Sequence, residues 1–205
     1  HPSQALLDFY TLKSELQRRD RLVDGCTIAI VGDLKYGRTV HSLIKLLSLA
    51  EGITFRTYSP PSLELPPDVA HYARARGHQV CDAESVTDAL VGADVVYATR
   101  VQRERMTEEV LANANISGNL LNRRILKKAG AAEIIIMHPL PRDSRMDSFD
   151  LSNDVDDLPG LSIFRQTDNG VLIRMAIFLT ALGCSSDMVK ATTKQLPWDA
   201  TLRWP

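Results

Sequence analysis

The sequence predicts an α/β fold in which a doubly wound parallel sheet is covered by helices on both faces. Short apolar runs rich in Val, Ile and Ala alternate about five times with segments whose apolar residues recur at helical spacing. Polar, glycine-containing loops follow several of these runs. This alternation is typical of βαβ units. Right-handed crossovers then place the carboxyl ends of all strands at one edge, in a Rossmann-like three-layer α/β/α arrangement.

The first half of the chain supplies helix and strand signals in regular order. Pro2 suits the first turn of a helix, and the Asp24-Gly25 turn separates that helix from the first strand. Prolines at 60–61 end the second strand, because proline cannot donate to a ladder. We expect a helix over 1–19, a strand over 27–31, a helix over 38–50, a strand over 53–58, a helix around 69–73 that stops at Gly77, a strand over 78–81 and a helix over 85–90 capped by Ser85.

The second half continues the alternation and then becomes polar. Residues 133–137 form the most strand-like run of the chain, and an acidic, weakly structured stretch follows to Pro159. We expect a strand over 93–99, a helical segment over 107–129 broken at 117–119, a short extended stretch over 161–164 and a final helix over 169–182 ended by Gly183. The sequence assigns no fold to the polar tail over 185–205.

Length and composition limit the classes of protein that fit. A chain of 205 residues with 44% hydrophobic residues can bury a core of one domain, or one and a fraction. The net charge of −1 predicts neither a nucleic-acid partner nor a membrane surface. The three cysteines are too widely spaced for a disulfide framework or a metal site, and no run is long enough to span a bilayer. We therefore expect a cytoplasmic protein without a metal.

The loop after the first strand is a candidate ligand site. Residues 32–37 contain two glycines and lead into a helix that begins near Arg38. In open α/β sheets ligands bind at such corners, and an arginine near a helix N-terminus can bind an anion. An ordinary strand–helix turn with a surface arginine fits these residues equally well. The loop lacks the Gly-x-Gly-x-x-Gly pattern, which argues against a nicotinamide dinucleotide.

Two further polar clusters follow predicted strands. Arg100 and Gln102 would lie on one side if the strand continues, and together they suit a carboxylate, whereas Arg103 is interpreted as a solvated charge. Residues 138–141 (HPLP) form a stiff segment whose carbonyl oxygens are free, and one of its X-Pro bonds is a candidate for the cis form. We interpret His138 as structural. Three clusters at one sheet edge predict a site for an anionic small molecule.

Four segments resemble aspartate carbamoyltransferases, and they occur in that family's order. They are residues 1–8 (HPSQALLD), 32–43 (GDLKYGRTVHSL), 99–105 (TRVQRER) and 138–142 (HPLPR). The resemblance covers about residues 1–183. Ornithine carbamoyltransferases usually have a cysteine where this chain has Pro139, and they lack the Lys-Tyr-Gly-Arg-Thr loop, so the aspartate enzyme is favoured.

The resemblance implies a role for each matching residue, whereas sequence physics alone would treat His1 and Gln4 as a frayed helix end. His1 and Gln4 would bind carbamoyl phosphate, with His1 polarising the carbonyl oxygen. Leu140 and Pro141, together with Pro139, would orient the carbamoyl amide through backbone oxygens. The aspartate ligands implied by the family are Arg38, Arg100 and Gln102. His1, Arg38 and Arg100 form the implied catalytic set, and neither metal nor organic cofactor is implied.

The resemblance also implies a missing half. Family members carry a carbamoyl-phosphate domain before this His-Pro-x-Gln segment, and they act as homotrimers in which a neighbouring subunit completes the site. We expect residues 1–19 to be an interdomain helix, 20–183 the aspartate-binding domain and 184–205 an extension. The isolated chain should be inactive, and fusion to or assembly with other pyrimidine-pathway enzymes fits the family. An ornithine-type carbamoyltransferase and a catalytically silent structural or regulatory homologue are the alternatives.

Overall fold

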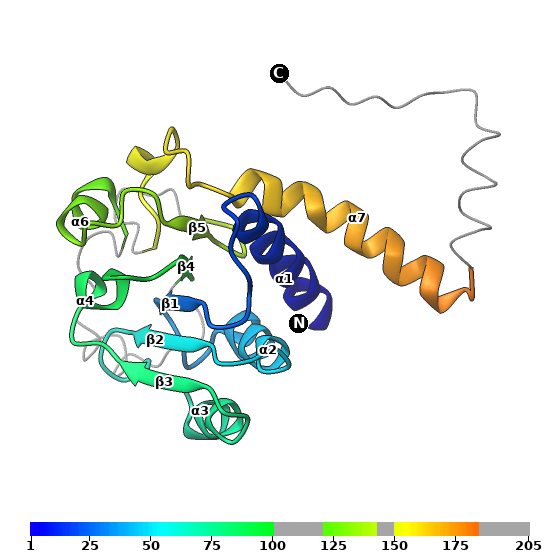
Figure 1. The fold of residues 1–205 in the computed structure, drawn as a ribbon, viewed down its shortest axis with the longest axis horizontal. Helices are drawn as coiled ribbons and strands as arrows, with labels where there is room; N and C mark the ends of the chain where they lie inside the picture. Colours follow the sequence, from blue (N-terminus) through cyan, green and yellow to red (C-terminus); the bar gives the residue numbers. More distant parts are fainter. Residues whose placement is uncertain (101–120, 143–149, 185–205) are drawn as a thin grey trace.

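The protein forms a five-stranded, fully parallel sheet with the strand order β3-β2-β1-β4-β5 (Figure 1). The computed structural model describes residues 1–100, 121–142 and 150–184. The strands are β1 (Thr27–Val31), β2 (Thr54–Tyr58), β3 (Gln79–Asp82), β4 (Val95–Ala98) and β5 (Ile135–Met137). The helices are α1 (Pro2–Gln17), α2 (Arg38–Leu47), α3 (Pro67–Arg74), α4 (Val86–Leu90), α6 (Arg123–Lys128) and α7 (Ile163–Ala181), with a 3-10 turn η2 (Asn153–Val155).

Two apolar layers hold the helices on opposite faces of the sheet. Successive residues of β4 alternate between them, because strand side chains point to opposite faces. Val95 and Tyr97 pack with the layer that contains α1, α2 and α3, and Val96 and Ala98 pack with the layer of α4 and α6. Each fully buried Leu, Ile or Val stabilises the fold by about 1.5–3 kcal/mol. The three-layer doubly wound fold predicted from the sequence is therefore confirmed.

The chain reverses its direction of winding at β1, which lies between β2 and β4. Ile30 of β1 is in register with Thr57 of β2 on one side and with Tyr97 of β4 on the other. In such sheets the loops after the two central strands diverge and leave a crevice at the carboxyl edge. The loop 32–37 and Arg100 both follow these central strands.

The last helix differs from its prediction. The extended stretch expected over 161–164 is limited to Leu161, which forms a parallel bridge with Ile136, and α7 already begins at Ile163. Ile163 packs into the layer of α4 and α6, so tertiary packing starts the helix six residues before the expected Asn169. Within α4, the capping by Ser85 is confirmed, since its Oγ accepts from the Asp88 N–H at 3.1 Å.

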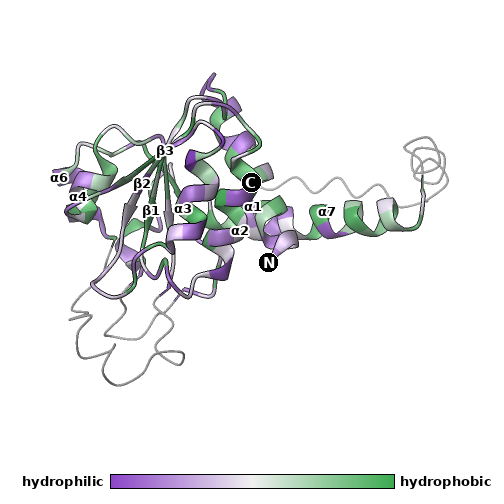
Figure 2. Cartoon of the chain, turned by 90° about the horizontal axis from the view of Figure 1, so that it is seen from below, coloured by the Kyte–Doolittle hydropathy of each residue, from purple (hydrophilic) through white to green (hydrophobic). Residues whose placement is uncertain are grey.

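The second half of α7 projects beyond the sheet and carries exposed apolar side chains (Figures 1 and 2). They include Val171, Met175, Phe178 and Leu182, whose spacing of four, three and four residues forms one stripe along the helix. None of the helices in the described ranges is both long enough and apolar enough to cross a membrane.

Candidate functional site

The loop between β1 and α2 is shaped by two glycines. Gly32 has a φ of +123°, and a Cβ there would lie 2.2 Å from the Thr99 carbonyl oxygen. A Cβ on Gly37 would lie 2.4 Å from the Asp33 carbonyl oxygen. Larger residues are therefore excluded at both positions. The loop packs tightly against the end of β4, and it places Arg38 at the first turn of α2 with its side chain exposed.

Arg100 lies at the same edge of the sheet. β4 ends at Ala98, and the buried Thr99 continues the contact to β1 through its N–H, which donates to the Val31 carbonyl at 2.9 Å. Arg100 follows directly and is partly buried. Gln102 lies outside the described residues, so its expected position beside Arg100 stays a prediction. Arg38 and Arg100 thus follow the two central strands at the crevice where such folds bind ligands.

The segment after β5 is held by the side chain of His138. The His138 N–H donates to Gln166 Oε1 at 3.0 Å, and Nδ1 of the same histidine accepts from the Leu140 N–H at 2.9 Å. Nε2 therefore carries the ring proton, and it lies 3.3 Å from Asp150 Oδ2. The Leu140-Pro141 bond is cis, and Leu140 has a φ of +52°. The structural role predicted for His138 agrees with these contacts.

A small cavity joins this segment to α1. Its volume is about 160 Å³, which suits a ligand of a few heavy atoms. It is lined by Gln4, Leu7, His138, Pro139, Leu140, Gln166, Thr167 and Arg174. The structure thus brings Gln4, Pro139 and Leu140 together from positions far apart in the sequence. His1 and Pro141 are not among the lining residues; His1 is exposed at the start of α1, and its amino group donates to Ser42 Oγ at 3.1 Å.

A larger cavity, of about 560 Å³, lies elsewhere in the molecule. Its lining includes Arg19, Arg21, Asp94 and Ile134, which lie near the amino ends of β4 and β5. None of the site residues predicted from the sequence lines it. Because ligands of open α/β sheets bind at the carboxyl edge, we assign the site to the smaller cavity despite its size. Among the described residues, no group of three or more His, Cys, Asp or Glu side chains is arranged to hold a metal.

A fully buried carboxyl group, Asp8, lies directly behind the small cavity. Asp8 Oδ1 accepts from Gln4 Nε2 at 2.8 Å and from Gln166 Nε2 at 2.6 Å, and Oδ2 accepts from the Tyr97 hydroxyl at 2.7 Å. Burial raises the pKa of Asp8 to about 6, although the three hydrogen bonds act in the opposite direction. Burial also raises the pKa of Tyr97 well above its usual value, and the neighbouring Asp8 carboxylate adds to that effect.

The sequence predicted no site role for several residues that the structure places at this site. They are Leu7, Asp8, Tyr97, Gln166, Thr167 and Arg174. The one available hint was the spacing of Gln4 and Asp8, which are four apart on a helix and therefore neighbours on its surface. Burial of a carboxylate beside two glutamine amides depends on α7, which lies more than 150 residues later in the chain.

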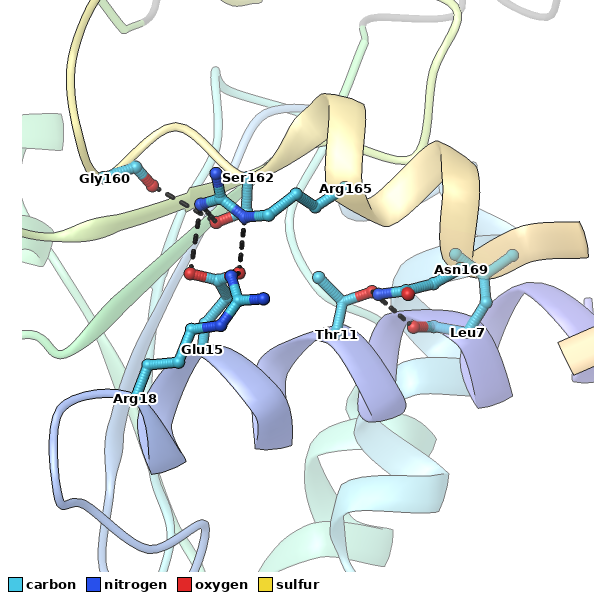
Figure 3. A network of polar contacts seen from close by, with 8 residues as sticks. All are labelled: Leu7, Thr11, Glu15, Arg18, Gly160, Ser162, Arg165 and Asn169. Atoms are coloured by element: carbon cyan, nitrogen blue, oxygen red, sulfur yellow. Dashed lines mark hydrogen bonds and ion pairs between the residues drawn. The ribbon is translucent and has the colours of Figure 1, made fainter. Parts of the chain in front are cut away.

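Polar contacts fix α7 along α1 and thereby set the position of Gln166 (Figure 3). The Arg165 guanidinium donates to both oxygens of the nearly buried Glu15, at 2.6 and 3.1 Å. One helical turn on, Asn169 Nδ2 donates to Thr11 Oγ1 at 2.9 Å. A paired arginine fork and a second hydrogen bond define both the rotation and the register of the two helices.

Comparisons with known proteins agree on one family. Residues 24–181 match the family model described as "Aspartate/ornithine carbamoyltransferase, Asp/Orn binding domain". An aspartate carbamoyltransferase catalytic subunit of Dichelobacter nodosus is 50% identical over 182 residues, which are 89% of this chain and 52% of that protein. The multifunctional protein CAD of Squalus acanthias is 40% identical over 89% of this chain and 8% of its own length.

Solved structures give the same result. The catalytic subunit of Methanocaldococcus jannaschii aspartate transcarbamoylase has a TM-score of 0.68 and 40% identity, covering 87% of this chain and 54% of that one. Aspartate transcarbamoylase of Trypanosoma cruzi, in complex with aspartate and phosphate, has a TM-score of 0.69 and 38% identity, covering 87% and 52%.

The chain spans between 52% and 60% of the length of the first three catalytic subunits it matches. The family model, in contrast, is matched over most of this chain. The resemblance seen in the sequence motifs is thereby confirmed. The chain belongs to the aspartate/ornithine carbamoyltransferase family, and the part of that family that it matches is the Asp/Orn binding domain.

Proposed function

We propose that this chain is the aspartate-binding half of an aspartate carbamoyltransferase. The complete enzyme transfers the carbamoyl group of carbamoyl phosphate to L-aspartate and forms N-carbamoyl-L-aspartate and phosphate in de novo pyrimidine biosynthesis. The observation that carries this proposal is the small cavity in which Gln4 meets Pro139 and Leu140, at the sheet edge that also carries Arg38 and Arg100.

The two arginines suit the second substrate. Aspartate has two carboxylates, and a guanidinium fork binds a carboxylate through two parallel hydrogen bonds. Arg38 and Arg100 come from different strand–loop connections, so they approach a ligand in the crevice from different directions. We assign Gln102 to the same substrate, as the family resemblance implies. The two guanidinium groups of Arg38 and Arg100 favour a dianionic ligand over the cationic side chain of ornithine.

The residues around the small cavity suit the carbamoyl group. Gln4 offers a side-chain amide on one wall, and Pro139 and Leu140 line the cavity as well. We assign the backbone oxygens of these two residues and of the neighbouring Pro141 to the carbamoyl amide, as the family resemblance implies. The uncharged amine of aspartate attacks the carbamoyl carbon, the bond from that carbon to the phosphate oxygen breaks, and the amine releases a proton as phosphate leaves. His1 polarises the carbonyl oxygen on which negative charge develops. The protein contributes mainly positioning and charge stabilisation.

The division of the chain follows from this proposal. Residues 1–19 connect to a carbamoyl-phosphate domain, residues 20–183 bind aspartate, and residues 184–205 extend beyond the domain. The complete enzyme acts in the cytoplasm as a homotrimer, and the name of the Squalus acanthias relative supports fusion to other pyrimidine-pathway enzymes. No metal and no organic cofactor takes part.

The test is product formation by the full-length protein with aspartate or ornithine as the acceptor. We expect carbamoyl aspartate and at least about a hundredfold preference for aspartate, since an unpaired buried charge costs several kcal/mol. A preference for ornithine would contradict this proposal and indicate an ornithine-type carbamoyltransferase. No product from either acceptor, in a folded protein, would favour the silent homologue.

A further inference from the structure

The hydrogen bonds behind the small cavity have a fixed direction. Asp8 is fully buried, and an ionised carboxylate can only accept hydrogen bonds. Both glutamines that contact its Oδ1 must therefore turn their NH2 groups toward it. An amide whose nitrogen is held in this way presents its carbonyl oxygen on the other side. For Gln4 the other side is the cavity, which its side chain lines.

We propose that Asp8 is a positioning residue, which holds Gln4 with its amide oxygen turned to the cavity so that this oxygen accepts hydrogen bonds from the NH2 group of a carbamoyl ligand. This inference rests on the proposed function. The inference adds to that function a residue, Asp8, that does not itself line the cavity. Without Asp8, no hydrogen bond among the described residues distinguishes the oxygen of the Gln4 amide from its nitrogen. A flipped amide would then point its NH2 group at the NH2 group of the ligand.

The same carboxylate aligns the opposite wall of the cavity. Gln166 donates to Asp8 through Nε2, and its Oε1 accepts from the His138 N–H at 3.0 Å. His138 in turn accepts from the Leu140 N–H at 2.9 Å. One acceptor, Asp8, thus sets the amide orientation on α1 and, through Gln166, the backbone of the segment after β5.

A third contact anchors Asp8 to the sheet. The Tyr97 hydroxyl donates to Oδ2 at 2.7 Å. Tyr97 is fully buried in β4, so the carboxylate cannot move without breaking a contact to the sheet.

A double-mutant cycle tests this role in the full-length enzyme. Asp8→Ala removes the acceptor, and we expect the KM for carbamoyl phosphate to rise about tenfold, as for a lost, oriented hydrogen bond. In a Gln4→Ala background the same change should raise that KM markedly less than tenfold, because only the effect of Asp8 through Gln166 is left to lose. Equal effects in both backgrounds would overturn the proposal, since a general structural defect does not depend on Gln4.

Matched variants separate positioning from folding. Asp94 is also a buried aspartate, next to the start of β4, and its Oδ2 accepts from the Thr27 N–H at 2.8 Å outside the cavity. Asp94→Ala should leave the carbamoyl phosphate KM within about twofold of wild type. Asp8→Leu repeats the cycle in case Asp8→Ala does not fold, because leucine is similar in size to aspartate and cannot accept hydrogen bonds. A rise in KM with Asp94→Ala equal to that with Asp8→Ala would contradict a specific role of Asp8.

A readout without turnover keeps this inference separate from the proposed function. Absence of carbamoyl aspartate formation by the wild-type enzyme would contradict the function and leave the network to be tested by NMR. The side-chain NH2 protons of Gln4 should exchange with solvent at least about tenfold faster in Asp8→Ala than in wild type, because their acceptor is gone. The same exchange rate in both proteins would overturn the positioning role.

Discussion

At the scale of single residues, the exposed Arg38 and the buried Asp8 have different tasks. Arg38 is at the first turn of α2, where its charge can reach a ligand. Asp8 has no exposed surface and acts only through its hydrogen-bonding neighbours. Substitution of the first should therefore change binding with little change in stability, and substitution of the second should change both.

Arg38→Ala should weaken the use of aspartate selectively. Losing one paired arginine–carboxylate contact should raise the KM for aspartate about a hundredfold and leave the KM for carbamoyl phosphate within about threefold. Steady-state kinetics of the full-length enzyme measure both constants. Lys45→Ala is the control, because Lys45 is an exposed cation in the last turn of the same helix. Equal effects of the two substitutions would show that only the general positive charge of α2 matters.

Asp8 should make stability depend on pH in an unusual direction for an aspartate. Its pKa is raised from 3.8 to about 6 in the folded state, so the folded protein binds more protons than the unfolded chain between these values. Its contribution is therefore fully present below about pH 4 and is lost as pH rises through about 6. Relative to Asp8→Asn, wild type should lose about 2.4 kcal/mol of unfolding free energy from pH 4 to pH 7.

Urea unfolding of wild type and Asp8→Asn at several pH values measures this difference. The facing groups are uncharged amides from α1 and α7 and the Tyr97 hydroxyl, whose own raised pKa keeps it protonated in this range. If the difference in unfolding free energy between wild type and Asp8→Asn is the same at every pH, that result would contradict the burial of an ionisable Asp8.

At the scale of elements, the loop between β1 and α2 is the most constrained connection. Gly32→Ala would place a Cβ against the Thr99 carbonyl at a positive φ, and should lower the unfolding free energy by about 3 kcal/mol. Gly25→Ala also has a positive φ, of +73°, but no atom lies within 4 Å of its Cβ. It should therefore cost only about 1 kcal/mol. Similar losses in both variants, measured by urea unfolding, would show that close packing against β4 is not the reason for Gly32.

The projecting half of α7 carries apolar side chains that the described part of this chain leaves exposed. An apolar stripe of this kind is rare on monomeric proteins. We expect a second copy of the isolated chain to bury this stripe. Sedimentation velocity should therefore show concentration-dependent association. Exchanging Met175 and Phe178 for glutamate should abolish it, whereas Leu22→Glu, at an exposed leucine outside α7, should not. A monomer at every concentration would show that the stripe needs no cover.

The strands and the last helix show what the sequence could and could not reveal. Apolar runs such as 133–137 predict buried strands because both faces of a parallel sheet are covered. The start of α7 was missed because the polar residues 165–169 hide its periodicity. The structure places two of them, Arg165 and Asn169, against α1. The role of Asp8 was missed because a carboxylate at the edge of an apolar stripe is expected to be exposed. Its partners on α7 and β4 become known only from the structure.

At the scale of the whole molecule, the proposed function divides the active site between this chain and a further domain. We assign the aspartate side and the Gln4 wall to this chain, and the catalytic subunits that it matches are about 1.7 times as long. We therefore expect the isolated chain to form no carbamoyl aspartate above background, because the proposed function assigns the phosphate-binding groups to the other half. Robust turnover by the isolated chain would show that this half is sufficient.

Carbamoyl aspartate formation by the full-length protein and its Arg100→Ala variant, compared side by side, tests the central claim most directly. The aspartate-binding role predicts product with wild type and a loss of aspartate use of at least about a hundredfold with Arg100→Ala. The KM for carbamoyl phosphate should change little. Arg103→Ala, at a neighbouring arginine that the sequence marks as solvated and that lies outside the described residues, should leave the kinetics near wild type. Unchanged kinetics in Arg100→Ala would contradict the assignment.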